Sequence, residues 1–343
     1  MRNRIFKYAY GIIISLLIAI PSWILGNFIP IIGGPIFAII IGMIISLIWI
    51  DKKEFNTGIS FTSKYVLQAA VVLLGFGLNL NVILVTGLQS LPIIIGTILV
   101  ALIVAFLMKK LLDMDSNLAI LIGVGSSICG GSAIAATAPV IGASDEEVAQ
   151  SISVIFFFNV VAAIIFPILG KMLGFSTTTG DAFGIFAGTA INDTSSVTAA
   201  ASTWDNMWGL GSQTLDKATT VKLTRTLAII PITLALSILK SRESNFNGEK
   251  FSLRNSFPIF ILYFIIAAII TTVLVGFGVD YSLFLPIKEL SKFFIIMAMG
   301  AIGLNTNLIK LVKSGGKPIL LGMTCWIAII ITSILLQNIL HIW

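Results

Sequence analysis

The sequence predicts an all-α integral membrane protein that forms a single polytopic membrane domain over residues 1–343. Hydrophobic residues make up 57% of the chain and charged residues only 10%, whereas a soluble domain carries roughly 25% charged residues. So few charged groups cannot cover a water-facing surface. Apolar stretches of about 20 residues, the length that crosses a bilayer as a helix, recur about eleven times along the chain.

The expected spans follow one another with short connections, and none of these connections is long enough for a soluble domain. The first span continues from a basic N-terminus through Pro21 and Trp23 without a small-residue cleavage site, which favours a span over a signal peptide. The eleven segments are 8–28, 32–50, 64–84, 91–109, 117–140, 148–173, 182–201, 218–239, 257–277, 289–310 and 317–339.

Basic residues alternate along the connections, which sets the expected orientation. The odd connections 29–31 and 85–90 carry no charge, and 142–147 is acidic. By the positive-inside rule the N-terminus lies in the cytoplasm and the C-terminus outside. With the net charge of +6 spread over short loops, no basic domain remains to bind nucleic acid. The cations are Arg2, Arg4 and Lys7, then Lys52, Lys53 and Lys64, Lys109 and Lys110, Lys171, Lys240, Arg242, Lys250 and Arg254, and Lys310, Lys313 and Lys317.

An internal repeat joins residues 64–110 with 290–336. GLNLNVILVTGLQSLPIIIG from Gly77 and GLNTNLIKLVKSGGKPILLG from Gly303 match at one offset of 226, with Gly, Asn, Asn, Pro and Gly in register. The copies lie an odd number of crossings apart and therefore point in opposite directions. Such an inverted repeat is typical of secondary transporters. Asn79, Asn81, Asn305 and Asn307 fall where the repeated spans end, which favours a turn role for them.

Two glycine-rich segments predict broken helices. GSSICGGSAIAATA begins at Gly125, and GTAINDTSSVTAAA begins 63 residues later at Gly188. Non-helical backbone at membrane depth survives only inside protein or beside a wet cavity, and the freed N–H groups of a helix start bind anions. A small-residue packing face is the alternative, and 117–140 and 182–201 could either cross or re-enter. The expected substrate-binding residues are Ser126, Ser127, Cys129, Gly130, Gly131, Ser132, Asn192, Thr194 and Ser195.

Four more polar residues within spans are candidates for function. Asp193 is the sharpest, because an ionisable group there costs at least ~2.5–3.5 kcal/mol to insert and marks ion pathways. We expect it to couple ion movement, with helix capping as its alternative role. Lys222 and Arg225 are candidate anion contacts, unless they extend to the interface. Asn159 is either a cavity group or a helix–helix partner.

Several classes of site are disfavoured. The only histidine, His341, is near the C-terminus, and the two cysteines, Cys129 and Cys325, both lie in apolar segments. No metal site, cofactor or enzyme activity is therefore expected. The nucleotide-binding Gly-Lys-Ser/Thr fingerprint is also missing from the sequence, so ATP is not expected to drive a cycle.

The motifs GFGLNLNVI, GVGSSICGGSAIAATAPVIGA, FFFN and GTAINDTSSVTAA, taken in that order, resemble the YeiH family of multi-pass bacterial membrane proteins, labelled sulfate exporters. Residues 70–173 resemble, more distantly, the first half of the bile acid:sodium symporter-like fold. The resemblance implies a core with crossed, unwound helices that moves against a second panel, in a bacterial inner membrane. It also implies an anionic substrate such as sulfate or an organosulfonate, held by residues 126–132 and 192–195.

The expected function is a secondary transporter of a small anion, by export or exchange coupled to H⁺ or Na⁺. A sodium-coupled organic-anion importer and a structural membrane protein are the alternatives. The expected partners are the substrate anion, the lipid bilayer, the coupling ion and, as an open alternative, further copies of the chain in a homo-oligomer.

Overall fold

The computed structural model describes residues 2–29, 33–49, 52, 54–240, 259–306 and 316–343. Within these ranges the regular structure is entirely helical, as predicted. Seven helices in the described part of the chain are long and apolar enough to cross a membrane. Whether the chain crosses eleven times, and with a symporter-like fold, stays a prediction.

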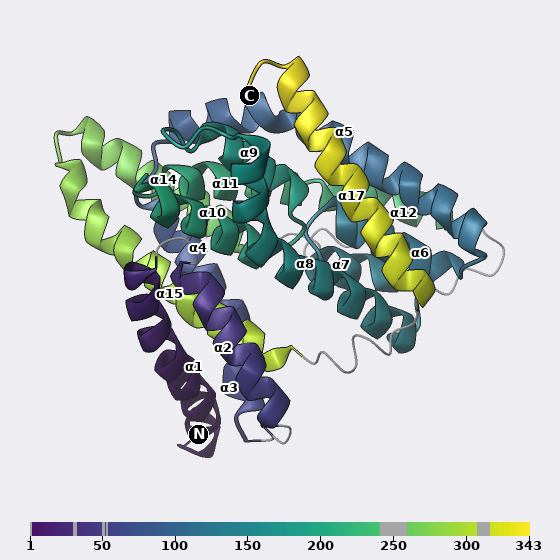
Figure 1. The fold of residues 1–343 in the computed structure, drawn as a ribbon, viewed down its shortest axis with the longest axis horizontal. Helices are drawn as coiled ribbons and strands as arrows, with labels where there is room; N and C mark the ends of the chain where they lie inside the picture. Colours follow the sequence, from purple (N-terminus) through teal and green to yellow (C-terminus); the bar gives the residue numbers. More distant parts are fainter. Residues whose placement is uncertain (1, 30–32, 50–51, 53, 241–258, 307–315) are drawn as a thin grey trace.

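The helices form two groups that lie side by side (Figure 1). We call the first group the panel. It consists of α1 (Arg2–Phe28), α2 (Gly34–Ile48), α3 (Asn56–Phe61), α4 (Leu67–Gly75), α14 (Ile259–Gly276) and α15 (Leu285–Asn305). A π-helical turn, Thr62–Val66, joins α3 to α4, and a 3₁₀ turn, Tyr281–Phe284, precedes α15. Within the panel, α2 and α15 pack closely against each other.

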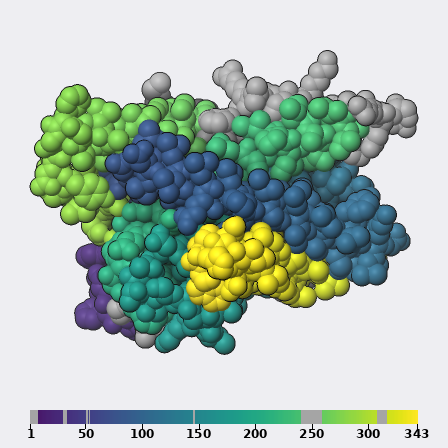
Figure 2. All heavy atoms as spheres, turned by 90° about the horizontal axis from the view of Figure 1, so that it is seen from above, coloured from purple at the N-terminus to yellow at the C-terminus, as the bar shows by residue number. Residues whose placement is uncertain are grey.

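The second group, the core, contains both glycine-rich segments. Its helices are α5 (Leu80–Leu112), α6 (Ser116–Ser127), α7 (Gly131–Ile141), α8 (Asp145–Leu173), α9 (Asp181–Ala190), α10 (Thr194–Trp208), α11 (Gln213–Thr226), α12 (Ile229–Lys240) and α17 (Gly316–Ile339). Long helices α5 and α17 lie against each other on one side of the molecule (Figure 2).

One predicted boundary is wrong. The expected spans 64–84 and 91–109 were separated by a connection at 85–90, but that stretch lies inside the 33-residue helix α5. The chain instead turns at 76–79, where the Asn79 side chain accepts a hydrogen bond from the Asn81 amide at 2.8 Å and caps α5. The new connection is also uncharged, so the alternation of basic loops is unchanged. Lys64, however, lies in the helical turn and not in a loop.

The repeated segments both contain a helix, an interruption and a second helix. In the first copy these are α4, residues 76–79 and α5; in the second they are α15, a break beginning at Thr306, and α17. Asn79 has the predicted turn role, and Asn305 is the last residue of α15. Asn307 and the rest of 307–315 lie outside the described residues. The opposite orientation of the copies stays a prediction.

The outer surface of the helices is apolar, as a lipid environment requires. Large side chains on α5 are half exposed or more, including Leu88, Ile95 and Ile103, and α17 exposes Ile331 and Leu335. A soluble protein rarely exposes such continuous apolar surface. Water-facing polarity begins at the helix ends, for example at Ser144, whose hydroxyl and backbone form a capping box with Glu147 at the start of α8.

Glycines set the contact between α2 and α15. A methyl group on Gly303 would overlap the Ile39 carbonyl oxygen and lie 3.0 Å from Cα of Gly42. A methyl group on Gly42 would in turn overlap the Gly300 carbonyl oxygen. Only residues without a side chain allow two helix backbones to approach this closely.

We therefore expect Gly303→Ala to lower the free energy of unfolding by about 1–3 kcal/mol, because a backbone carbonyl cannot yield as a side chain can. Thermal unfolding of the purified protein measures this. Gly276→Ala on α14 is the control, because a methyl group there meets nothing within 4 Å. Equal melting of the two variants would contradict the close crossing.

Candidate functional site

Both glycine-rich segments break where the sequence predicts. The first break is residues 128–130, between α6 and α7, and Gly130 adopts φ +71°, a conformation that side chains disfavour. The second break is residues 191–193, between α9 and α10. The four half-helices have 12, 11, 10 and 15 residues, so none reaches the ~20 residues of a membrane crossing alone.

The first break is a sharp change of direction. A methyl group on Gly125 would lie 2.9 Å from Cδ1 of Ile134, although nine residues of straight helix would separate the two positions by about 13 Å. The α6 and α7 halves therefore fold back towards each other. The prediction of broken helices is confirmed for both segments, and a continuous small-residue packing helix is excluded.

The carboxyl ends of α6 and α9 are held by two buried cations from α11. Lys222 Nζ donates to the carbonyl oxygens of Ile128 at 2.6 Å and Ile191 at 3.1 Å. These two residues belong to different breaks, so one ammonium group joins both.

Arg225 extends the same arrangement along α11. Its Nε and Nη2 donate to the carbonyl oxygens of Ser127 at 2.8 Å and Ser126 at 3.0 Å, and its Nη1 donates to that of Thr189. The carbonyls at a helix end lack intrahelical partners and form the negative pole of the helix dipole. Both cations therefore compensate the two carboxyl ends. Both side chains are fully buried, so they neither extend to the interface nor offer their charge to a ligand.

The amino ends of α7 and α10 differ in how they are capped. Gly130, the N-cap of α7, has no side chain to cap the helix, although the Cys129 sulfur accepts a hydrogen bond from the Ala133 amide. By contrast, Asp193 caps α10: its carboxylate accepts hydrogen bonds from the Ser195 amide at 3.0 Å and from the Ser195 hydroxyl. The geometry thus agrees with the capping alternative for Asp193. The amides of Gly131 and Ser132 at the start of α7 have no such capping carboxylate.

Asn159 of α8 connects the two breaks. Its Oδ1 accepts a hydrogen bond from the Asp193 amide at 3.2 Å. A methyl group on Gly130 would lie 3.3 Å from Nδ2 of Asn159 and 3.5 Å from Cβ of Asp193. Asn159 therefore has both of the roles that were given as alternatives: it is a helix–helix partner, and it lines the cavity described next.

A cavity of about 730 Å³ opens between the panel and the core, beside these amino ends. The core supplies residues of α7, α8, α10 and α12, and the panel supplies residues of the α3–α4 helix, α14 and α15. The lining residues are Ser63, Lys64, Leu67, Gln68, Val71, Gly131, Ser132, Ala135, Ala136, Pro139, Ile152, Ile155, Phe156, Asn159, Asp193, Thr194, Ser195, Ile229, Phe260 and Ile302.

Four of the nine predicted substrate residues line this cavity, together with Asp193. They are Gly131, Ser132, Thr194 and Ser195. The cavity lining does not include Ser126, Ser127, Cys129, Gly130, Asn192, Lys222 or Arg225. Ser126 and Ser127 act through their backbone carbonyls, and Cys129 places its Sγ 2.9 Å from the Ser132 hydroxyl. Apart from Gly130, which has no side chain, these residues are buried inside the protein.

The panel side of the cavity was not predicted. Gln68, Phe260 and Ile302 lie in ordinary apolar stretches, and only the polarity of Gln68 within a span could have pointed to it. Their side chains meet the core through tertiary packing, which sequence periodicity does not report.

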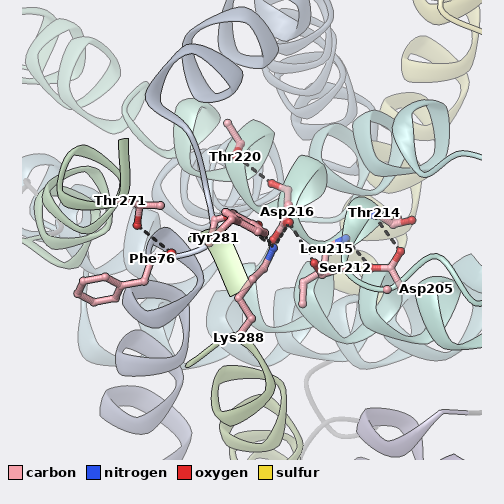
Figure 3. Close-up of polar contacts among 12 residues, drawn as sticks. Phe76, Asp205, Ser212, Thr214, Leu215, Asp216, Thr220, Thr271, Tyr281 and Lys288 are labelled. Atoms are coloured by element: carbon pink, nitrogen blue, oxygen red, sulfur yellow. Dashed lines mark hydrogen bonds and ion pairs between the residues drawn. The ribbon is translucent and has the colours of Figure 1, made fainter. Parts of the chain in front are cut away.

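A second polar centre lies between the panel and the core, at residues 76–79 (Figure 3). Lys288 of α15 forms an ion pair with Asp216 of α11 at 2.6 Å, with the two side chains 5% and 15% exposed. Tyr281 donates to the Gly77 carbonyl at 2.6 Å, and Thr271 donates to that of Phe76 at 2.8 Å. The freed carbonyls of this turn are thus satisfied by the panel, while the ion pair ties the panel to the core.

The start of α11 is fixed by a second buried carboxylate. Asp205 accepts hydrogen bonds from the Thr214 and Leu215 amides, both at 2.9 Å (Figure 3). This satisfies two of the four free N–H groups of the helix start. Because α11 carries Lys222 and Arg225, Asp205 also positions the two cations that hold the breaks.

Comparison with known proteins places this arrangement in a family. The family model described as Conserved hypothetical protein 698 matches residues 10–322. The chain belongs to this family. The match includes the 76–79 turn, both glycine-rich breaks and the start of the second repeat, so the whole site lies inside the family region.

Full-length relatives in the family are bacterial and carry the name UPF0324 membrane protein. One from Streptococcus pyogenes serotype M6 is 58% identical over 335 residues, which cover 97% of each chain. One from Streptococcus agalactiae serotype V is 57% identical over 333 residues, 97% of this chain and 98% of the relative. One from Fusobacterium nucleatum is 57% identical over 354 aligned positions covering both chains completely. The family predicted from the motifs and the multi-pass membrane character are confirmed.

We expect Arg225→Met to destabilise the core strongly, because it leaves the carbonyls of Ser126, Ser127 and Thr189 buried without donors. Each unpaired buried group costs about 1–3 kcal/mol. Arg225→Lys keeps the charge and should recover part of the loss in a thermal unfolding measurement.

Lys110→Met, at an exposed position of α5, is the control and should melt like the unmodified protein. If Arg225→Met also melted at the unmodified temperature, the guanidinium group would not be holding the breaks.

Proposed function

We propose that the protein is a secondary transporter of a small anion, sulfate or a sulfonate, by export or exchange coupled to H⁺ or Na⁺. One observation carries the proposal: the start of α7, where the N-cap Gly130 has no side chain, lies at the cavity beside Asp193. Amide donors for an anion and an ionisable carboxylate thus lie in the same cavity between the panel and the core.

The anion would bind at the first turn of α7. Free N–H groups at a helix start bind negative groups, and the positive end of the helix dipole adds to the attraction. The Ser132 hydroxyl lines the same space. It donates to the Cys129 carbonyl at 3.2 Å and would become a further donor to the anion by rotating away from that carbonyl. Asn159, whose Oδ1 is already used by Asp193, has its Nδ2 left to donate.

Asp193 would couple the anion to a cation. Its negative charge opposes a second negative charge at the neighbouring helix start, so binding of the anion and neutralisation of Asp193 favour each other. The coupling is reciprocal, as linkage requires. A proton on the carboxylate or a Na⁺ ion beside it would each supply that neutralisation, and the cation would then travel with the anion.

Movement would occur between the panel and the core. The cavity lies at their boundary, and transporters with inverted repeats bind substrate at such a boundary and rock or slide one body against the other. An inverted orientation of the two repeats, a cytoplasmic N-terminus and an inner-membrane location belong to the proposal, as does action as a carrier and not as an enzyme.

Asp193→Asn is the direct test. Asn caps helices about as well as Asp, so the variant should fold normally while losing the charge. We expect anion binding that no longer changes with pH or Na⁺, and loss of gradient-driven uptake into vesicles reconstituted with the purified protein.

Asp181→Asn, at an exposed position 68% accessible at its side chain, is the matched control and should retain coupled uptake. Normal gradient-driven flux through Asp193→Asn would remove this carboxylate from the mechanism. A sodium gradient and a proton gradient applied separately distinguish the coupling ions and also test the sodium-coupled importer.

A further inference from the structure

The cavity has more apolar wall than an inorganic anion can use. Resting on the transport function proposed above, we infer that the substrate is an organic sulfonate or carboxylate with an apolar tail, bound head-first at α7, and not free sulfate. The inference rests on the size of the cavity and on the chemistry of its walls, which are independent of the helix start that receives the charged group.

Much of the cavity wall is hydrocarbon. The core contributes Ile152 and Phe156, one helical turn apart on α8, and Ile229 from α12. The panel contributes Phe260 and Ile302. Because both bodies supply apolar side chains, closing them on a ligand would place hydrocarbon against hydrocarbon from two sides.

The polar part of the lining is unevenly placed. Asn159, Ser132, Thr194 and Ser195 lie at or beside the helix breaks, together with Asp193. The remaining polar residues belong to the panel: Ser63 and Lys64 lie in the π-helical turn, and Gln68 lies in α4. Lys64 is exposed, so its charge attracts anions without being committed to a buried contact.

Size points in the same direction. A cavity of about 730 Å³ falls in the range of roughly 300–1,000 Å³ that encloses drug-sized organic ligands. Sulfate is compact and strongly hydrated. Its water would have to be replaced by donors on every side, and the apolar part of the wall would offer none. An apolar tail instead displaces the water that covers those walls.

A series of n-alkyl sulfonates from methane- to hexanesulfonate tests this, with inorganic sulfate as the reference. The charged group is constant, so only the tail changes. We expect the dissociation constant, measured by calorimetry on the protein in lipid nanodiscs, to fall about fourfold for each methylene that is buried. Hexanesulfonate should then bind at least 100-fold more tightly than sulfate and compete with it for uptake.

Two variants distinguish the contribution of the charged head group to binding from that of the apolar tail. Ile152→Ala removes part of the wall and should weaken hexanesulfonate about five- to tenfold while changing methanesulfonate less than twofold. Ser132→Ala removes a donor at the head and should weaken every sulfonate by the same factor. Ile168→Ala, on the same helix, 54% exposed and outside the cavity lining, is the control and should change nothing.

The outcomes distinguish this inference from the function on which it rests. Equal affinity for sulfate and every sulfonate, with coupled uptake of sulfate, would overturn the apolar-tail substrate and leave anion transport standing. No binding and no uptake of any anion in the series would overturn both. A tail dependence that Ile152→Ala does not reduce would place the tail elsewhere and would also overturn the inference.

Discussion

Backbone carbonyls freed at membrane depth must find donors, and the rest of this structure depends on how that requirement is met. The carboxyl ends of α6 and α9 meet at α11, where Lys222 and Arg225 donate to five of their carbonyl oxygens. Because the negative ends of both broken helices are compensated inside the protein, the amino ends of their second halves are left to face the cavity. The carboxyl ends of α6 and α9 are thus structural, whereas the amino ends of α7 and α10 are available for binding.

The same solution recurs at the other two interruptions. At residues 76–79 the carbonyls of Phe76 and Gly77 accept from Thr271 and Tyr281, with Lys288 also donating to Gly77 at 3.4 Å. At the end of α15, Lys52 donates to the Leu304 carbonyl. Ser46 similarly donates to that of Thr306 at 2.9 Å. A lysine thus serves every one of these interruptions in the described residues, which explains how the chain tolerates unwound backbone among so many apolar residues.

Sequence reasoning identified the all-helical membrane character and both glycine-rich breaks because composition and small-residue content are local properties. It misplaced the turn after α4, since an uncharged stretch at 85–90 looks the same inside a helix as between helices. It also misjudged Lys222 and Arg225. The position of a cation near the end of a span suggests a group at the surface. The carbonyl partners of Lys222 and Arg225 lie about 30 to 100 residues away in the sequence, so only the tertiary structure shows them. Asp193 was found because a charge within an apolar segment is conspicuous.

Position 126 is buried and position 132 is accessible on opposite sides of the first break, and cysteine reactivity measures this difference directly. In a background with Cys129→Ser and Cys325→Ser, single cysteines at Ser132 and Ser126 are exposed to a charged maleimide. We expect Ser132→Cys to react and to be protected by a bound anion, because position 132 is exposed in the cavity. Ser126→Cys, which is fully buried, should stay unmodified. Equal reaction at both positions, or no protection by any anion, would contradict this expectation.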